Sequence, residues 1–510
     1  MRRLASGVFL AGVFWAAGLF GQDITGTIEG TVLDPSGAAV PKAKVSVINT
    51  DRNQVVRTVT TETSGVYSAV LLPIGHYSVK AEAAGFKTET ITGIVLNVND
   101  VLKVNLTMQV GAVSETVEVT ASAATVELGT PAVENTVEGA QVRELSLATR
   151  NYEQLVALMP GVTNQGAVDE LFVGTTGASG TTTTIPYAVN GMRNSANNWT
   201  LDGADNIDRG SNLTLGSFPS IEAIAEFKVE RGSYTADTGR AGGAQVNVVT
   251  KSGTSHYHGD LFEFFRNDKL NANNWFNNAT KVNLVDRVNP QTPCTTANYT
   301  DCYAKQSPYR WNDFGGTVGG PVPLGGYNRN HDKTFFFFSE EAKRIINYTT
   351  FTPTLPTQGM LQGNFPQPVC ITVLTVNSGI NCPTGSAPVS SIPTSMFTPN
   401  AQAYIKDIFS KVPLSSGNTA ADLTSGVFPG RILLNYREEL IKIDQRFNDK
   451  FAIFGKFSND AIPTTEPAGI FSCSSFPGSC VTNTQSPGKS LVFHGVYSIK
   501  PTLLNEAGYA

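Results

Sequence analysis

The sequence predicts a mainly β protein whose second half crosses a membrane as β-strands. Three observations predict this fold class. Only 15% of the 510 residues are charged, against about 25% in ordinary soluble domains, and 48 residues are glycine. Short runs of alternating polar and apolar residues are separated by turns rich in Gly, Pro, Asn and Asp. Beyond residue 254, long and short connections alternate between such runs, as they do in outer-membrane barrels.

The first 22 residues have the pattern of a secretory signal peptide. Arg2 and Arg3 precede an uncharged apolar run from Leu4 to Phe20, and small and polar residues follow. A transmembrane anchor is the alternative, but the run is a little shorter than the ~20 residues that a spanning helix needs. We expect residues 1–22 to direct export and to be cleaved. The net charge of -5 argues against a nucleic-acid partner.

Residues 23–110 predict a small β-sandwich. Short runs such as AKVSVINT, QVVRTVTT and SGVYSAVLL are divided by turn clusters. Turn and core positions follow in a distinctive order: Gly30, Thr31, Val32, Asp34, Gly37, Val40, Pro41, Ala43, Val45, Gly65, Tyr67, Leu72, Pro73, Gly75, Tyr77, Val79, Gly85 and Phe86. In this order the segment resembles the carboxypeptidase regulatory-like domain. The resemblance implies a transthyretin-like or carbohydrate-binding-like sandwich, an accessory module without catalytic chemistry.

Residues 111–125 predict a linker that contains one exposed strand. The strand alternates polar and apolar residues and has little to bury: Glu115, Thr116, Val117, Glu118, Val119, Thr120 and Ala121. Such a strand can add itself to the edge of a partner's sheet through backbone hydrogen bonds. It resembles the TonB box of TonB-dependent outer-membrane receptors, which implies that TonB binds it. An ordinary linker or a strand of the next domain is the alternative.

Residues 126–254 predict an α+β domain. Residues 140–162 carry apolar side chains at mixed helical spacing, and Pro160-Gly161 ends that run. Residues 221–254 hold the strands FKVERG and VNVVTKSGT with a glycine cluster between them. These runs resemble the beginning and the last strands of a receptor plug domain. The resemblance implies a domain that fills a water-filled barrel and presents polar groups to the barrel wall.

Between these runs, the stretch NGMRNSANNWTLDGADN shows no hydrophobic periodicity. A polar segment that ends in Leu-Asp-Gly lies here in receptor plugs, and Leu201-Asp202-Gly203 matches it. The candidate substrate contacts of the plug are Asn190, Arg193, Asn197, Asn198, Trp199, Asp202 and Asp205. A calcium site formed by Asp202, Asp205, Asn206 and Asp208 is the alternative, but the spacing of these residues fits no EF-hand loop, and we expect no metal site.

Residues 255–510 predict the first strands of a transmembrane β-barrel. The candidate strands are His256–Arg266, Tyr309–Val322, Lys333–Ile345, Ile432–Phe447, Phe451–Ser458 and Ser490–Ile499. In the fourth, apolar Ile441 and Ile443 alternate with Lys442 and Asp444, so one face suits lipid and the other suits water. Plugged outer-membrane transporters use about 22 strands. We therefore expect an incomplete barrel and a sequence that is the N-terminal portion of a longer receptor.

The first, third and fifth connections between these strands are long and are expected to face outward. Each holds one pair of neighbouring cysteines: Cys294 and Cys302, Cys370 and Cys382, Cys473 and Cys480. Six cysteines permit several connectivities, but local pairing would tie each loop to itself in an oxidising compartment. Zinc is disfavoured because no pair has the close Cys-x2-4-Cys spacing. The run from Phe335 to Phe338 suits an aromatic girdle or a strand packed on both faces, and we favour the girdle.

No motif supports an enzyme. The five histidines are scattered, and the sequence has no Gly-x-Ser-x-Gly elbow, P-loop or His-Glu-x-x-His motif. Together, the segments resemble a TonB-dependent outer-membrane receptor of the Oar-like kind. The resemblance implies outer-membrane localisation with the N-terminal domain in the periplasm, and uptake of a scarce oligosaccharide, peptide or iron chelate. The implied partners are outer-membrane lipid and TonB with its inner-membrane motor complex, and no cofactor is expected. The alternative is a glycan-binding adhesion or structural protein of the outer membrane.

Overall fold

The computed structural model describes twenty parts of the chain. They are residues 24–112, 116–120, 132–145, 147, 149–164, 185–210, 212–234, 242–272, 284–286, 302–304, 308–322, 327–351, 354–370, 388–411, 414, 416–419, 428–467, 481–485, 487–500 and 503–510. The predicted signal peptide lies outside the described residues, as do Cys294, Cys382, Cys473 and Cys480. Among the described helices, none is long and apolar enough to cross a membrane.

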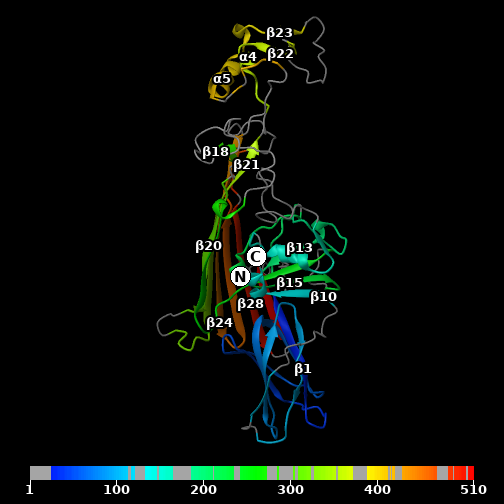
Figure 1. Ribbon diagram of the computed structural model, residues 1–510. Coiled ribbons are helices and arrows are strands. Elements are labelled where there is room, and N and C mark those ends of the chain that lie inside the picture. Colours follow the sequence, from blue (N-terminus) through cyan, green and yellow to red (C-terminus); the bar gives the residue numbers. More distant parts are fainter. Residues whose placement is uncertain are drawn as a thin grey trace, which may run out of the picture.

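Two β-sheets form an N-terminal sandwich (Figure 1, blue). One sheet has the order β4-β1-β7, with β8 also paired to β1, and the other has the order β3-β2-β5-β6-β9. The strands are β1 (Thr25–Leu33), β2 (Lys44–Asn49), β3 (Gln54–Thr60), β4 (Val66–Pro73), β5 (Gly75–Glu82), β6 (Thr88–Leu96), β7 (Val101–Lys103), β8 (Leu106–Thr107) and β9 (Thr116–Thr120). The predicted sandwich is confirmed.

Alternating side chains from both sheets build one core in this sandwich. Ile28, Val47 and Val79 are fully buried in it. The hydroxyl of the buried Tyr67 donates to the carbonyl of Val104 at 2.7 Å, which satisfies a polar group that would otherwise be costly to bury. Gly30 passes this same carbonyl so closely that a Cβ would lie 1.9 Å from its oxygen, so β1 needs glycine there.

The inner domain, which comprises the described residues from 132 to 254, has a five-stranded sheet of order β10-β15-β16-β13-β14. These strands are β10 (Val133–Glu138), β13 (Asn198–Leu201), β14 (Ala204–Asp205), β15 (Ile224–Gly232) and β16 (Gln245–Thr250), beside a hairpin of β11 (Val162–Asn164) and β12 (Tyr187–Val189). The helical pieces are α2 (Gly139–Glu144) and the 3-10 helices η1 (Tyr152–Leu158), η2 (Asn194–Ala196) and η3 (Ile221–Ala223). The predicted α+β character is confirmed.

The second half of the chain forms the membrane sheet, of order β17-β20-β21-β24-β25-β28-β29. Its strands are β17 (His258–Asn267), β20 (Arg310–Pro321), β21 (Thr334–Phe351), β24 (Phe428–Asn448), β25 (Phe451–Ala461), β28 (Pro487–Lys500) and β29 (Leu503–Tyr509). The six predicted strands are all present, and each pairs antiparallel with the next. The connections alternate in length as the sequence indicated.

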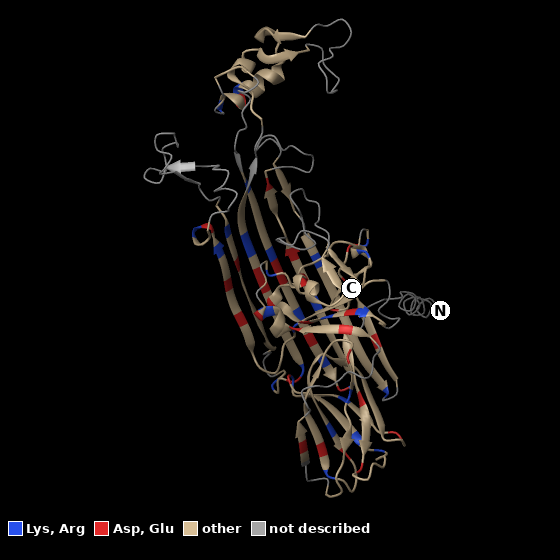
Figure 2. Cartoon of the chain, turned by 45° about the vertical axis from the view of Figure 1, so that its right-hand side comes forward, with Lys and Arg blue, Asp and Glu red and all other residues tan. Residues whose placement is uncertain are grey.

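The two faces of the membrane sheet differ as the period-2 pattern predicted. On β24, Ile441 and Ile443 are 41% and 45% exposed, whereas Lys442 between them is 3% exposed. Charged residues recur along the strands in Figure 2. Since Lys442 is buried against Asp202 of the inner domain, the alternate apolar positions Ile441 and Ile443 are left to face lipid.

The aromatic run on β21 differs from the favoured interpretation. Phe335 and Phe337 are 1% and 0% exposed, and Phe337 packs against Ala223 of the inner domain and Leu440 of β24. Phe336 and Phe338 alternate with them and are half-buried. The aromatic girdle therefore accounts only for Phe336 and Phe338, because the inner domain covers the other face of the sheet around Phe335 and Phe337.

Small elements extend the connections at the end of the membrane sheet opposite the sandwich (Figure 1). They are η5 (Asp268–Leu270), β18 (Leu284–Asp286), β19 (Cys302–Ala304), α4 (Gln358–Leu361), β22 (Asn364–Val369), β23 (Val389–Ser391), η7 (Thr394–Met396), α5 (Pro399–Asp407), η8 (Phe409–Lys411), β26 (Thr464–Glu466) and β27 (Thr482–Thr484). Cys370 is disulfide-bonded, as its predicted role requires. The three cysteine pairings themselves stay predictions.

We predict that α5 lies outside the cell and that the β24–β25 turn lies in the periplasm. A cysteine in the variant Ala403→Cys, on exposed α5, should react with a membrane-impermeant maleimide on intact cells. A cysteine in the control Asp449→Cys, whose native side chain is 92% exposed in the turn, should react only after permeabilisation. We expect a labelling ratio of at least roughly tenfold, because short turns face the periplasm. Equal labelling on intact cells would contradict this topology.

Candidate functional site between three domains

A tight hairpin positions Asp202. Strands β13 and β14 pair through Leu201 and Ala204, which leaves Asp202 and Gly203 as the two turn residues. Their φ angles are 50° and 78°, as in a type I′ turn, for which Asp-Gly is a favoured sequence. The geometry of the turn therefore explains the Asp-Gly pair of the Leu-Asp-Gly motif. It also projects the carboxylate from the end of the strand.

The carboxylate of Asp202 lies between two lysines of the membrane sheet. Its Oδ1 lies 3.1 Å from Nζ of Lys442 on β24, and its Oδ2 lies 3.1 Å from Nζ of Lys456 on β25. The carboxylate also accepts hydrogen bonds from the backbone N–H and the hydroxyl of Thr250, at 3.0 and 2.8 Å. The side chains of the three ionic residues are at most 4% exposed. The inner domain thus meets the membrane sheet through a dry ionic contact.

This contact resolves a conflict within the membrane sheet. Lys442 and Lys456 are directly opposite each other in the register of β24 and β25. Like charges in that arrangement destabilise a sheet, and a carboxylate between them offsets their repulsion. Burial raises the pKa of Asp202, but the attraction to Lys442 and Lys456 and the hydrogen bonds from Thr250 together outweigh burial and hold that pKa below the ordinary range. Asp202 is therefore ionised at physiological pH.

A second buried ionic contact joins the two domains through Arg150. Its Nη2 lies 3.1 Å from Oε1 of Glu222 in the inner domain, and its Nε lies 3.3 Å from Oδ2 of Asp313 on β20. The guanidinium also lies over the ring of Phe264 on β17, 4.0 Å from its centroid. One arginine thereby bridges an inner-domain helix and two strands of the membrane sheet.

The backbone of Phe218 provides a third, uncharged point of attachment. Its N–H donates to Oδ2 of Asp460 on β25 at 2.9 Å, and its carbonyl accepts from the hydroxyl of Tyr436 on β24 at 2.6 Å. All three residues are buried. Both polar groups of one peptide segment are therefore satisfied by the membrane sheet.

The N-terminal sandwich is attached to the inner domain through β15. Nζ of Lys228, which is 0% exposed, lies 2.9 Å from Oδ1 of Asp100 in the sandwich and 2.5 Å from Oε1 of Glu134. The N–H of Val98 donates to Oε1 of Glu226 at 2.5 Å. Burial raises the pKa of Glu226 to about 8, so this carboxyl is mostly protonated at neutral pH and can be buried without a counter-charge.

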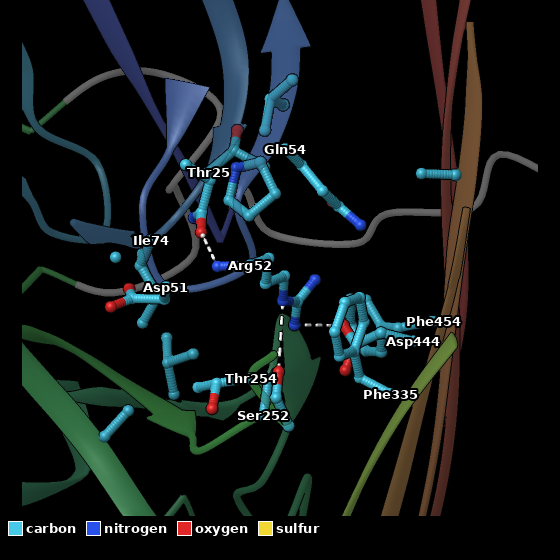
Figure 3. Close-up of a pocket in the computed structure, with 18 of the residues that line it drawn as sticks. Thr25, Asp51, Arg52, Gln54, Ile74, Ser252, Thr254, Phe335, Asp444 and Phe454 are labelled. Atoms are coloured by element: carbon cyan, nitrogen blue, oxygen red, sulfur yellow. Dashed lines mark hydrogen bonds and ion pairs between the residues drawn. The ribbon is translucent and has the colours of Figure 1, made fainter. Parts of the chain in front are cut away.

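Arg52 is the residue at which all three domains meet (Figure 3). It comes from the sandwich, donates from Nε to the carbonyl of Gly253 at 3.2 Å, and pairs with Asp444 on β24 at 3.1 Å. Its guanidinium lies 5.0 Å from the ring centroid of Phe335. A cavity of about 580 Å³ surrounds it, lined by all three domains.

The structure divides the predicted substrate contacts into two groups. Asn197, Asn198, Trp199 and Asp202 are buried. Asn197 is used structurally, because its amide donates to the carbonyl of Tyr187 at 2.7 Å and accepts from the N–H of Ala244 at 2.9 Å. The polar composition of this stretch is thus explained in part by hydrogen bonds within the domain.

The remaining candidates are exposed. Asn190 and Arg193 lie on the surface around η2, and Asp205 pairs with Arg209 at 2.7 Å. These are the members of the predicted set that a soluble ligand can reach. Within the described residues, no group of three or more His, Cys, Asp or Glu side chains is arranged to hold a metal.

Sequence reasoning identified Asp202 but not its partners. The alternation predicted that Lys442 faces away from lipid, and the pattern did not indicate what it contacts. Arg52 and Lys228 were not singled out. The sequence does carry one signal for such contacts, a charged residue at an inward-facing position of an alternating strand. A charged residue that is buried at such a position requires a partner.

The predicted TonB-binding strand is present as β9, and Glu115 and Ala121 at its ends lie outside the described residues. It occupies the end of a sandwich sheet, where it pairs in parallel with β6. Glu118 and Val119 are exposed there. The segment thus has the extended conformation that strand addition requires.

A sheet with an apolar outer face and buried charges on its inner face defines an outer-membrane β-barrel protein. The chain belongs to the family described as the outer membrane beta barrel domain, whose model matches residues 249–510. The carboxypeptidase regulatory-like domain matches residues 27–109. These matches confirm the resemblance of residues 23–110 to a carboxypeptidase regulatory-like domain and the predicted outer-membrane barrel, and they place the protein in the outer membrane.

Similar proteins include transporters. The chain is 27% identical over 339 residues to the TonB-dependent transporter Oar of Myxococcus xanthus, a match that covers 65% of this chain and 28% of Oar. The outer membrane transporter YddB from Escherichia coli matches 74% of this chain and 38% of its own, with a TM-score of 0.42 and 9% identity. The siderophore receptor PirA from Acinetobacter baumannii matches 71% and 45%, with a TM-score of 0.29 and 13% identity.

We predict that Asp202→Asn loosens the inner domain. The substitution leaves the buried Lys442 and Lys456 without a counter-charge, which should cost about 3–5 kcal/mol. Hydrogen exchange of residues 245–250, measured by mass spectrometry, should accelerate accordingly. Asp205→Asn is the control, because its partner Arg209 is 74% exposed and the loss should stay below about 1 kcal/mol. Equal exchange in the two variants would contradict the assigned role.

We predict that burial of Glu226 at the joint between the sandwich and the inner domain becomes less favourable as pH rises. The folded-state pKa of Glu226 is raised to about 8 from an ordinary value of 4.5, so its contribution is complete below that ordinary value and is lost as pH rises through about 8. Exchange protection of residues 97–100, corrected for intrinsic rates, should therefore fall across this window. Glu226→Gln should abolish the dependence, and a wild-type protein with constant protection would refute the interpretation.

Proposed function

We propose that this chain is part of a TonB-dependent transporter of the outer membrane, in which the inner domain, residues 126–254, is the plug. The observation that carries the proposal is the position of Asp202 between Lys442 and Lys456, because it fixes a folded domain to the lipid-spanning sheet through buried charge. The similarity to Oar, a TonB-dependent transporter, supports the choice of class.

An ionic attachment suits a domain that must leave its place. Breaking a buried ion pair is costly while the contact is dry, so the resting position is well defined. Once water enters, an exposed pair contributes only about 0–1 kcal/mol and each freed charge is hydrated. The inner domain can therefore move against this wall without exposing a large apolar surface. An apolar interface of the same size would resist displacement throughout.

The arrangement of the sandwich supports a periplasmic position. Arg446, beside the short β24–β25 turn, donates from Nη2 to the carbonyl of Val55 in the sandwich at 2.8 Å. The sandwich therefore lies at the end of the sheet where the connections are short, and short connections belong to the periplasmic side. TonB reaches a receptor from that side, which supports the proposal that residues 115–121 bind it.

The proposed cycle needs no nucleotide site in this chain. A scarce oligosaccharide, peptide or iron chelate binds from outside, at the long connections and at exposed inner-domain residues such as Asn190 and Arg193. TonB then captures residues 115–121 by strand addition. Force from the inner-membrane motor complex displaces the inner domain, and the substrate passes.

We predict that a peptide with residues 112–124 binds the isolated C-terminal domain of a TonB from the same cell. Isothermal titration calorimetry should detect binding, and a peptide with Val117→Pro and Val119→Pro should bind at least roughly tenfold more weakly, since proline disrupts strand addition. Equal or absent binding of both peptides, together with adhesion of intact cells to glycans, would favour a surface adhesion protein.

A further inference from the structure

The cavity around Arg52 has an apolar side and a charged side. Ile74 of the sandwich and Phe454 of β25 lie on the apolar side (Figure 3), packed with Val249 of the inner domain. On the rest of the lining, lysine and arginine outnumber aspartate and glutamate by eight to five. A volume of about 580 Å³ that combines apolar walls with a few charged groups is typical of small-molecule sites.

Most acidic groups of this lining are already neutralised. Three of the five have basic partners: Asp444 with Arg52 at 3.1 Å, Asp449 with Arg446 at 2.6 Å and Asp51 with His76 at 3.0 Å. Burial raises the pKa of Glu226 to about 8, so its carboxyl is mostly protonated at neutral pH. Glu138 is the fifth and is exposed. The charge that is left on the lining is therefore positive.

Lys251 on the inner-domain side of the cavity has no acidic partner. Its backbone N–H donates to the carbonyl of Ala223 at 2.8 Å, but among the described residues no carboxylate pairs with its ammonium. Burial, together with the nearby charge of Arg143, lowers the pKa of Lys251, and the attraction of Glu222 and Asp260 offsets this only in part. An anion beside Lys251 would offset both influences.

Arg57 on β3 is a second cation without an acidic partner, and it comes from the sandwich. Its Nη2 donates to the carbonyl of Val70 at 3.2 Å, and its Nη1 donates to the hydroxyl of Ser498 on β28. Neither partner is charged, and the buried Nε has no hydrogen-bond partner among the described residues. Burying a cation without an opposite charge costs free energy, which an anion in the cavity would offset.

We propose that this cavity binds an anionic small molecule through phosphate or carboxylate groups. Lys251 and Arg57 attract the charged groups, and the side formed by Ile74 and Phe454 receives an apolar part. Residues of the short β24–β25 turn line the cavity, so the ligand enters from the periplasm. Because the two cations belong to different domains, the bound ligand stabilises the contact between the sandwich and the inner domain. Binding at this site does not require TonB.

Isothermal titration calorimetry of the full chain in detergent, at low ionic strength, tests the site. Pyrophosphate and succinate are the probes for the two kinds of anionic group. Putrescine is the control ligand, since it has the four-carbon length of succinate and the opposite charge. We expect at least one anion to bind with a dissociation constant below roughly 1 mM, and the tighter one identifies the preferred group. Binding of neither anion, or equal binding of putrescine, would overturn the proposal.

Variants of the two cations locate the site. Lys251→Met and Arg57→Met should each weaken anion binding at least roughly tenfold, since each removes a charge-assisted hydrogen bond. Lys103→Met is the matched control, because Lys103 is exposed on β7 outside the cavity and its loss should change the affinity less than roughly twofold. Unchanged affinity in Lys251→Met, or equal weakening in Lys103→Met, would contradict the site.

The melting temperature separates a ligand contact from a structural role for Lys251. Since its ammonium has no carboxylate partner among the described residues, Lys251→Met should melt no lower than wild type without ligand. Wild type should gain melting temperature when the tighter anion is added, and Lys251→Met should not. A ligand-free variant that melts lower than wild type would assign Lys251 to the structure and count against the proposal.

Discussion

The structure depends on one requirement, that charge buried between the inner domain and the membrane sheet must be paired. Lys442 and Lys456 face each other across β24 and β25 and would repel without Asp202. The carboxylate is in turn held by Thr250, so the turn after β13 and the end of β16 are fixed relative to the sheet. Burying charge is acceptable here because each ionic group has a partner within 3.1 Å.

This requirement extends from the sheet to the N-terminal sandwich. Arg52 joins the sandwich to Asp444 on the same β24 strand, two residues beyond Lys442, while Lys228 joins it to the inner domain. The sandwich therefore contacts both of the parts that are proposed to separate. If the inner domain moves relative to the membrane sheet, the sandwich cannot keep its contacts with both.

Local sequence patterns predicted the parts of this architecture that depend on neighbouring residues. The alternation around Lys442 gave the orientation of β24, and Leu201-Asp202-Gly203 indicated the turn. The pairing of Asp202 with Lys442 was not predictable, since the two are 240 positions apart and meet only once two sheets are in register. Phe335 and Phe337 differed from the girdle for the same reason: their face is covered by a distant segment. The pairing of β9 with β6 was not predictable either, because composition does not determine which sheet edge a strand joins.

The contacts differ in strength in an order that fits a pull from the periplasm. Strand β9 has one free edge among the described strands and exposed side chains, so it separates before any buried contact. The joint around Lys228 is buried but small. The contact of Asp202 is buried and shared by two lysines, so displacing a single carboxylate breaks both ion pairs together. The repulsion between the two lysines is then no longer offset, so the contact between Asp202 and the sheet either keeps both ion pairs or loses both.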